Sequence, residues 1–161
     1  MVPDDPALFD DFFAWARQRD GSLPDGLIRH EARRAPHVAT ALEPGTCAVY
    51  VFTLSESSGT HCPAGAHRAL KVGSAGCRSN ARFQYQHYNP RSAQSTLAAM
   101  ILNAPYHWRF LGIAAVDEST VGEWIRANTD RDDYFLPAAH ESLLLDLERF
   151  LRGRLGPVFE G

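Results

Sequence analysis

The residues best suited to phosphate chemistry lie together in one stretch of the chain. Residues 57–116, sixty in all, contain no aspartate or glutamate. The same stretch contains Arg68, Lys71, Arg78, Arg82, Arg91, Arg109, His61, His67, His87 and His107. Guanidinium and ammonium groups bind phosphate oxygens, and imidazole transfers protons near neutral pH. We therefore expect phosphate contacts here, with Arg78, Arg82 and Arg91 as candidates; a merely solvated basic face is the alternative.

The overall charge conceals this partition. The net charge is −3, which by itself disfavours a nucleic-acid partner. Residues 1–56 carry −4, residues 57–116 carry +6 and residues 117–161 carry −5. Lys71 is the only lysine among 16 basic residues. Whether it has a functional role depends on the residues around it. The charge distribution, rather than its sum, indicates a phosphate-binding region.

Hydrophobic periodicity and turn residues predict the elements that must position these groups. The predicted order is helices over 6–19 and 26–34, strands over 46–54 and 68–72, helices over 79–88 and 94–103, a strand over 107–116, and helices over 121–128 and 138–152. The first two strands flank a Gly-, Ser- and Pro-containing loop and should form a hairpin. This pattern predicts an α+β fold, in which a small, mainly antiparallel, three-stranded sheet is flanked by helices.

The last predicted helix brings a carboxylate to the border of the sheet. Its apolar arc consists of Leu143, Leu144, Leu147, Phe150, Leu151 and Leu155. At 100° per residue, Glu148 falls at the edge of that arc. An ordinary boundary glutamate would occupy the same place, so the position alone is not specific.

Composition and charge also bound the class of protein. We expect an acidic helical N-terminal extension over 1–45 and a main domain over 46–161. No apolar run approaches the roughly 18 residues of a membrane helix, and the N-terminus is acidic where a secretory signal is basic. The three cysteines fit no short zinc knuckle, and a metal site from His61, Cys62 and Cys77 is disfavoured. A cytoplasmic protein with reduced thiols and no membrane partner is expected.

Two tripeptides on successive strands, AVY at 48–50 and KVG at 71–73, resemble motifs of the GIY-YIG nuclease superfamily. Further landmarks follow in that family's order, namely Arg82, His87 and Glu148, with Pro157 nine residues after the glutamate. The resemblance covers residues 46–161. It implies a GIY-YIG-like nuclease domain that hydrolyses phosphodiester bonds in DNA, of restriction or genome-defence type.

The resemblance also implies a role for each residue. Tyr50 would act on the attacking water as a phenolate or a hydrogen-bonding relay, and Lys71 could supply the positive charge that favours phenolate. Arg82 would brace the scissile phosphate. His87 would relay a proton or bind phosphate. Glu148 would be the ligand of Mg²⁺ or Mn²⁺, which accepts one carboxylate together with waters and phosphate oxygens.

The chain also departs from the family pattern. Ala48 replaces Gly in the first motif, and Lys71 replaces Tyr in the second. Glu160 replaces Asn, where it is either a second ligand near metal and substrate or a cap of the terminal turn. Arg82 and His87 are 140° apart on a regular helix, so they converge only if the helix unwinds near His87, which Asn89-Pro90 permits.

These departures keep other functions open. A non-catalytic nucleic-acid-binding module on a degenerate GIY-YIG scaffold is the main alternative. A protein-interaction domain would have only Phe9, Phe12 and Phe13 of the acidic N-terminal helix in its favour, and those rings are expected to pack on the main domain. A double-strand cut requires two active centres or two encounters, which makes a homodimer an expectation.

Overall fold

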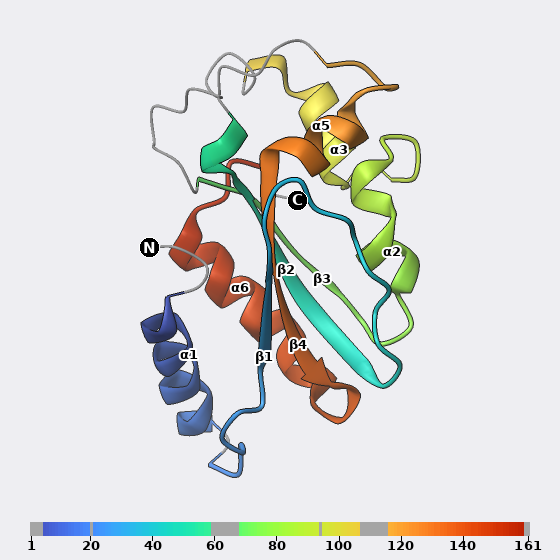
Figure 1. Cartoon of the computed structure of the whole chain (residues 1–161). Coiled ribbons are helices and arrows are strands. Elements are labelled where there is room, and N and C mark those ends of the chain that lie inside the picture. The colour runs from blue at the N-terminus through green and yellow to red at the C-terminus, as the bar shows by residue number, and fades with distance from the viewer. Residues whose placement is uncertain (1–4, 20, 59–67, 94, 107–115, 160–161) are drawn as a thin grey trace.

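The computed structural model describes residues 5–19, 21–58, 68–93, 95–106 and 116–159 and contains one antiparallel sheet (Figure 1). Its four strands are β1 (Arg29–Arg33), β2 (Thr46–Leu54), β3 (Ala69–Ala75) and β4 (Thr129–Pro137). They are ordered β1-β4-β2-β3. The α+β class and the antiparallel pairing of β2 with β3 are confirmed, whereas the expected three-stranded sheet has four strands.

The central strand β4 is the main element that the sequence did not predict. It reads TDRDDYFLP, and all of its residues except Pro137 are buried. Hydropathy does not predict such a strand, because charged residues are rarely buried unless they are paired. Here the charges pair with one another and with β1, as Arg131 with Asp133 and His30 with Asp132.

Strand β1 corrects a second prediction. The expected helix over 26–34 is a strand, because Arg29–Arg33 pairs along its whole length with β4. The side chains of Arg33 and His30 reach Asp133 and Asp132 on the neighbouring strand. Strand pairing with charge compensation therefore prevails over the local helical spacing. The strand predicted over 107–116 falls almost entirely outside the described residues.

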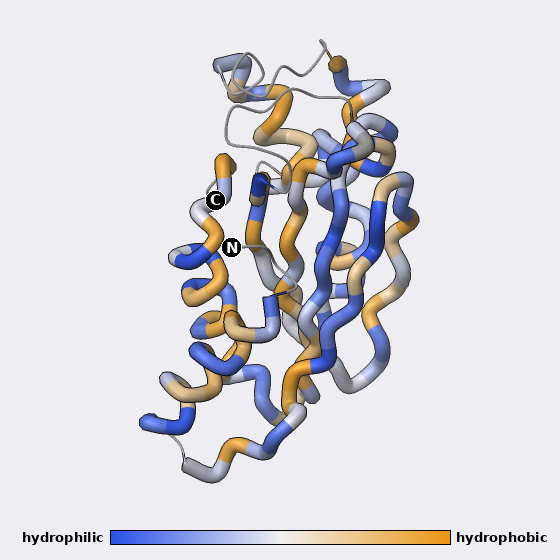
Figure 2. Tube along the Cα trace, turned by 60° about the vertical axis from the view of Figure 1, so that its left-hand side comes forward, coloured by the Kyte–Doolittle hydropathy of each residue, from blue (hydrophilic) through white to orange (hydrophobic). Residues whose placement is uncertain are grey.

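Helices cover both faces of the sheet. On one face lie α1 (Pro6–Arg19) and α6 (Leu144–Leu155), and on the other lie α2 (Asn80–Gln84), α3 (Leu97–Asn103) and α5 (Val121–Asn128). Figure 2 separates these layers and shows apolar and polar stretches alternating along the helical segments. Phe12 is fully buried and packs on Phe150, so the N-terminal aromatic cluster packs on the rest of the fold as predicted.

Two predicted helices are divided into shorter pieces. The helix expected over 79–88 ends at Gln84, and residues Gln86–Tyr88 form a separate 3₁₀ turn, η2. The helix expected over 138–152 begins as a 3₁₀ segment, η3 (Ala138–Leu143), and continues as α6 to Leu155. Gly156 ends α6 with a positive φ of 55°, the left-handed conformation that glycine adopts readily.

The remaining general expectations concern thiols and membranes. Cys47 and Cys77 are free thiols, and Cys62 is outside the described residues. Within the described ranges, none of the helices has the length and apolar character that a membrane crossing demands.

Candidate active site

The phenol of Tyr50 reaches the edge of the sheet although its side chain is fully buried. Tyr50 lies in β2, and its register partner in the edge strand β3 is Gly73. A Cβ atom at position 73 would lie 2.7 Å from both Cε2 and the oxygen of Tyr50. The ring therefore lies directly over a strand glycine, as close backbone approach requires. The hydroxyl comes within 3.5 Å of the carbonyl oxygen of Ser74.

Two nitrogen donors converge on the oxygen of Tyr50. Arg82 Nε donates to it over 3.3 Å, and His87 Nε2 lies 2.6 Å away. The backbone N–H of Leu97 donates to His87 Nδ1 over 3.2 Å, so in the neutral ring the proton is on Nε2. His87 therefore also donates to the phenol. The oxygen of Tyr50 is thus surrounded by hydrogen-bond donors, as a negatively charged acceptor would be.

The break between α2 and η2 makes this convergence possible. Tyr85 separates the two elements, and its backbone N–H bonds to Ala81 before the helical path changes. Because Arg82 is in the last turn of α2 and His87 is in η2, the 140° separation of a regular helix no longer applies. The unwinding that the sequence required for convergence is therefore present.

Burial determines the protonation of the two groups. Burial raises the pKa of the Tyr50 phenol above its usual value of 10.0, and the nearby Arg82 cation opposes that rise. Burial also lowers the pKa of His87 well below 6.5, with further lowering by the cations Arg131, Lys71 and Arg82. The imidazole is therefore neutral at physiological pH and keeps the tautomer that donates to Tyr50.

Glu148 meets the same edge of the sheet from the opposite face. It lies on α6, and its side chain is 13% exposed. The hydroxyl of Ser74 donates to Glu148 Oε2, while Arg152 Nη2 donates to Oε1 over 2.5 Å. Ser74 thus connects the Tyr50 side of the site with the Glu148 side, since its carbonyl faces Tyr50 and its hydroxyl contacts Glu148. The predicted position of Glu148 at the border of the sheet is confirmed.

Lys71 is close to this cluster but does not contact the phenol. It is 1% exposed, and its ammonium group donates to the sulfur of Met100 over 3.4 Å. Burial, together with the cations Arg152 and Arg82, lowers the pKa of Lys71 from 10.5 to about 8. The charge expected beside Tyr50 is instead that of Arg82 and Arg131.

A hydrated divalent cation fits this edge only as a single-ligand site. Across the described residues, no group of three or more His, Cys, Asp or Glu side chains could hold a metal ion. Glu148 offers one carboxylate, each oxygen of which keeps a free lone pair beside its present partner. Mg²⁺ accepts such a site when waters and phosphate oxygens complete its shell. The guanidinium of Arg152 must then move away from the cation.

The remaining predicted residues lie apart from the phenol. Arg78 is exposed in the turn that precedes α2. Arg91 is exposed and is bound by Glu118, with Nη2 and Oε2 2.7 Å apart. Glu160 is outside the described residues. Among the described residues predicted to bind substrate, Arg82 is therefore the one that contacts Tyr50.

Sequence reasoning missed three residues of this site, namely Ser74, Arg152 and Arg131. Arg152 could have been found, because it follows Glu148 by four residues on a helix, the spacing of an ion pair. Ser74 directly follows the KVG motif, but no pattern assigns its hydroxyl a partner. Arg131 belongs to β4, and because the sequence did not predict that strand, nothing indicated that Arg131 would be near Tyr50.

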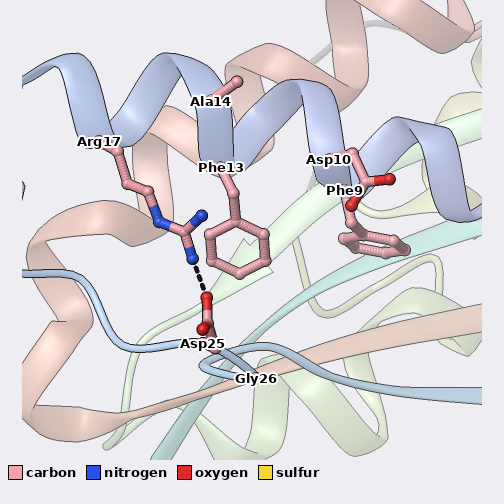
Figure 3. Close-up of a pocket in the computed structure, with 7 residues that line it drawn as sticks. All are labelled: Phe9, Asp10, Phe13, Ala14, Arg17, Asp25 and Gly26. Atoms are coloured by element: carbon pink, nitrogen blue, oxygen red, sulfur yellow. Dashed lines mark hydrogen bonds and ion pairs between the residues drawn. The ribbon is translucent and has the colours of Figure 1, made fainter.

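Two cavities bounded by described residues lie elsewhere. The cavity in Figure 3, about 370 Å³, lies between α1 and the turn at Asp25-Gly26. An ion pair between Arg17 and Asp25 crosses it, beside the ring of Phe13. A second cavity, about 410 Å³, adjoins the Arg91–Glu118 pair. Neither includes Tyr50 or Glu148.

Comparison of the chain with models of protein families, with functionally described proteins and with solved structures finds no match. The functional interpretation therefore depends on the geometry of the residues themselves.

Proposed function

We propose that the protein is a divalent-metal-dependent DNA endonuclease of the GIY-YIG type. The observation that carries the proposal is the phenolic oxygen of Tyr50, which receives hydrogen bonds from both Arg82 and His87. Two N–H donors on one oxygen match the needs of a phenolate better than those of a structural phenol. Ser74 connects this oxygen to Glu148, a carboxylate at the same edge.

The proposed reaction is hydrolysis of one phosphodiester bond. Ionised Tyr50 takes a proton from water, the resulting hydroxide attacks phosphorus, and the bond to the 3′-oxygen breaks. That oxygen leaves as a hydroxyl after taking a proton from solvent, and Tyr50 returns the proton that it gained to solvent. Arg82 orients the phosphate, and the His87 N–H holds the tyrosine oxygen toward the water.

Glu148 is the residue that would hold the metal. A bound Mg²⁺ or Mn²⁺ supplies positive charge that stabilises the transition state at the phosphate and eases departure of the leaving oxygen. Glu148 contributes the negative charge that retains the cation, and the Ser74 hydroxyl orients that carboxylate.

A cleavage assay tests this proposal. Purified protein is incubated with supercoiled plasmid and with Mg²⁺ or Mn²⁺, alongside Glu148→Gln and the control Glu123→Gln, which alters an exposed glutamate of α5. The wild type and the control should nick or linearise the plasmid, and Glu148→Gln should not. Equal cleavage by all three would eliminate Glu148 as the ligand.

A non-catalytic DNA-binding module is the second candidate, because Arg152 and Ser74 already bond to both oxygens of Glu148. Arg82→Ala separates the two candidates. In an enzyme it lowers the cleavage rate far more than DNA affinity, whereas in a binding module it weakens salt-dependent retention and no product forms. Arg149→Ala is the control, since that side chain is 75% exposed on α6.

The proposal extends to the partners of the enzyme. Cleavage of both DNA strands would be carried out by a homodimer in the cytoplasm, where the free thiols stay reduced. Sedimentation of the protein with and without duplex DNA tests the dimer.

A further inference from the structure

A buried cation, Arg131, lies beside Tyr50 on the face of the sheet that α2, α3 and α5 cover. Arg131 is fully buried and is the register partner of Phe52 in β2. Its Cζ lies 4.4 Å from the ring centroid of Phe83 and 5.3 Å from that of Tyr50. A guanidinium at these distances is attracted to the aromatic faces. Arg131 therefore constrains the Tyr50 ring from within the core.

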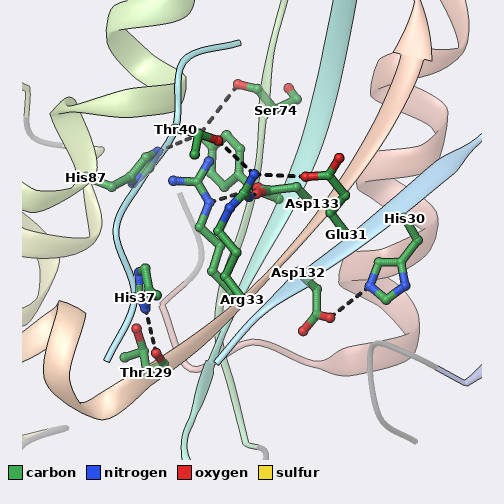
Figure 4. A network of polar contacts seen from close by, with 12 residues as sticks. His30, Glu31, Arg33, His37, Thr40, Ser74, His87, Thr129, Asp132 and Asp133 are labelled. Atoms are coloured by element: carbon green, nitrogen blue, oxygen red, sulfur yellow. Dashed lines mark hydrogen bonds and ion pairs between the residues drawn. The ribbon is translucent and has the colours of Figure 1, made fainter. Parts of the chain in front are cut away.

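The hydrogen bonds of Arg131 fix the direction of its side chain. Nε donates to Asp133 Oδ1 over 2.8 Å, and Nη1 donates to the Tyr88 hydroxyl over 3.1 Å. Nη2 is buried and has no hydrogen-bond partner among the described residues. The other oxygen of Asp133 pairs with Arg33, one of the labelled residues in Figure 4. A buried ion pair costs desolvation energy, and a core of apolar residues could replace it without that cost.

Arg131 also holds the element that carries His87. Tyr88 directly follows His87 in η2, and its oxygen accepts from Arg131. The Tyr88 hydroxyl donates to His37 Nε2 over 3.0 Å, because His37 Nδ1 is committed to the carbonyl oxygen of Thr129 at 2.8 Å. Figure 4 shows the bond between His37 and Thr129 beside the strands. This chain of bonds secures η2, and with it the imidazole of His87.

The charges around the phenol come from every adjoining element. Arg82 is in α2, Lys71 in β3, Asp133 and Arg131 in β4, and Glu148 and Arg152 in α6. Of these cations, Arg131 is the one that acts on both partners from within the core. It lowers the pKa of His87 and opposes the rise in the pKa of Tyr50 that burial causes.

We propose that Arg131 is a positioning residue for the Tyr50–His87 pair, which it serves by anchoring Tyr88 and by placing a buried positive charge against the phenol ring. The inference rests on the proposed function, because it assigns a purpose to Tyr50. It explains why a fully buried ion pair stands in a central strand at this point of the sheet.

The test uses three substitutions in the full chain. Arg131→Met removes the charge and keeps much of the volume, whereas Arg131→Lys keeps the charge. Arg126→Met is the matched control, since Arg126 lies 4.5 Å from the Tyr88 ring centroid and is not among the cations acting on Tyr50 or His87. Circular dichroism is used to check whether each variant is folded. If Arg131→Met does not fold, Tyr88→Phe breaks the same link without leaving the ion pair incomplete.

The first readout does not require nuclease activity. ¹⁵N NMR of labelled histidine at pH 7 should identify His87 as the Nε2–H tautomer in the wild type and in Arg126→Met. In Arg131→Met or Tyr88→Phe, the His87 signals should move toward the average of two exchanging tautomers, and Arg131→Lys should retain part of the wild-type signal. Unchanged His87 signals in folded Arg131→Met or Tyr88→Phe would overturn the inference.

The second readout is the pH profile of DNA cleavage. Cleavage should increase with pH as Tyr50 ionises, and Arg131→Met should shift this increase to a pH about one unit higher. That is the effect expected of losing a nearby cation. An unchanged profile, with only a lower amplitude, would reduce Arg131 to a structural residue. Absence of cleavage by the wild type would refute the proposed function, while the NMR result would still decide whether Arg131 positions His87.

Discussion

The Nε2 atom of His87 lies 2.6 Å from the phenolic oxygen of Tyr50, and it faces that oxygen with a proton. The direction follows from Leu97, whose backbone N–H occupies the other ring nitrogen. A phenol that accepts from His87 and Arg82 has its own proton left for Ser74, whose carbonyl is 3.5 Å distant. The two donors favour the ionised phenol, whereas burial keeps the pKa of Tyr50 above its ordinary value.

Replacing Tyr50 with phenylalanine tests this relationship most directly. The ring would keep its place over Gly73, while the acceptor of both hydrogen bonds would disappear. We expect DNA cleavage to fall by about 100- to 10,000-fold, the usual contribution of a general acid or base. Single-turnover cleavage under saturating DNA measures the loss. Tyr85→Phe, at a side chain that is 58% exposed, is the control; a similar loss in both variants would exclude a specific role for Tyr50.

Gly73→Ala tests the close approach of the Tyr50 ring to β3. The new methyl group would lie 2.7 Å from the ring, so the ring or the strand must move. We expect the free energy of unfolding to fall by about 1–3 kcal/mol, as in other overpacked cores, and cleavage to fall with it. Urea denaturation measures the first effect.

Gly153→Ala is the matched control for that substitution. Gly153 is in α6, and a Cβ atom there would have no described neighbour within 4 Å apart from the backbone of its own helix. Alanine should raise the free energy of unfolding by about 0.5–1 kcal/mol, because glycine is the poorer helix former. If Gly73→Ala were as stable as this control, the close ring contact would have no energetic importance.

The candidate site was more predictable from the sequence than the sheet that carries it. Tyr50 and Gly73 are in strands with apolar or β-branched neighbours, and Glu148 is on a helix with a clear apolar arc. Strand β4 has no such pattern. Its Arg131 and Asp133 can be buried only because they are paired, and the sequence alone does not reveal those pairs. Those partners come from residues far apart in sequence, such as Arg33, which hydropathy does not connect.

The buried histidines predict a specific loss of stability at mildly acidic pH. Burial lowers the pKa of His37 from 6.5 to about 4 and that of His87 in the same direction. Between pH 6.5 and 4 the unfolded chain therefore binds protons that the folded chain does not, so stability falls as pH falls. From pH 7 to 5.5 the two groups together should remove about 2–3 kcal/mol.

Urea titrations at half-unit steps of pH measure that loss. This range lies above the ordinary pKa of carboxyl groups, so histidine protonation should dominate the change. A free energy of unfolding that stays constant from pH 7 to 5.5 would mean that neither imidazole is held neutral by the fold.

Arg152→Met tests the competition between a guanidinium and a metal ion for Glu148. Arg152 Nη2 is 2.5 Å from Glu148 Oε1, and the two side chains are 30% and 13% exposed. Partly exposed pairs at this helical spacing contribute up to about 1 kcal/mol, so removing Arg152 should tighten Mn²⁺ binding by about three- to fivefold. Calorimetric titration of the DNA-free protein with Mn²⁺ measures this without reference to cleavage. Arg149→Met, whose arginine is 75% exposed on the same helix, should leave the affinity unchanged. Weaker binding in Arg152→Met than in this control would mean that the arginine orders the carboxylate for the metal instead of competing with it.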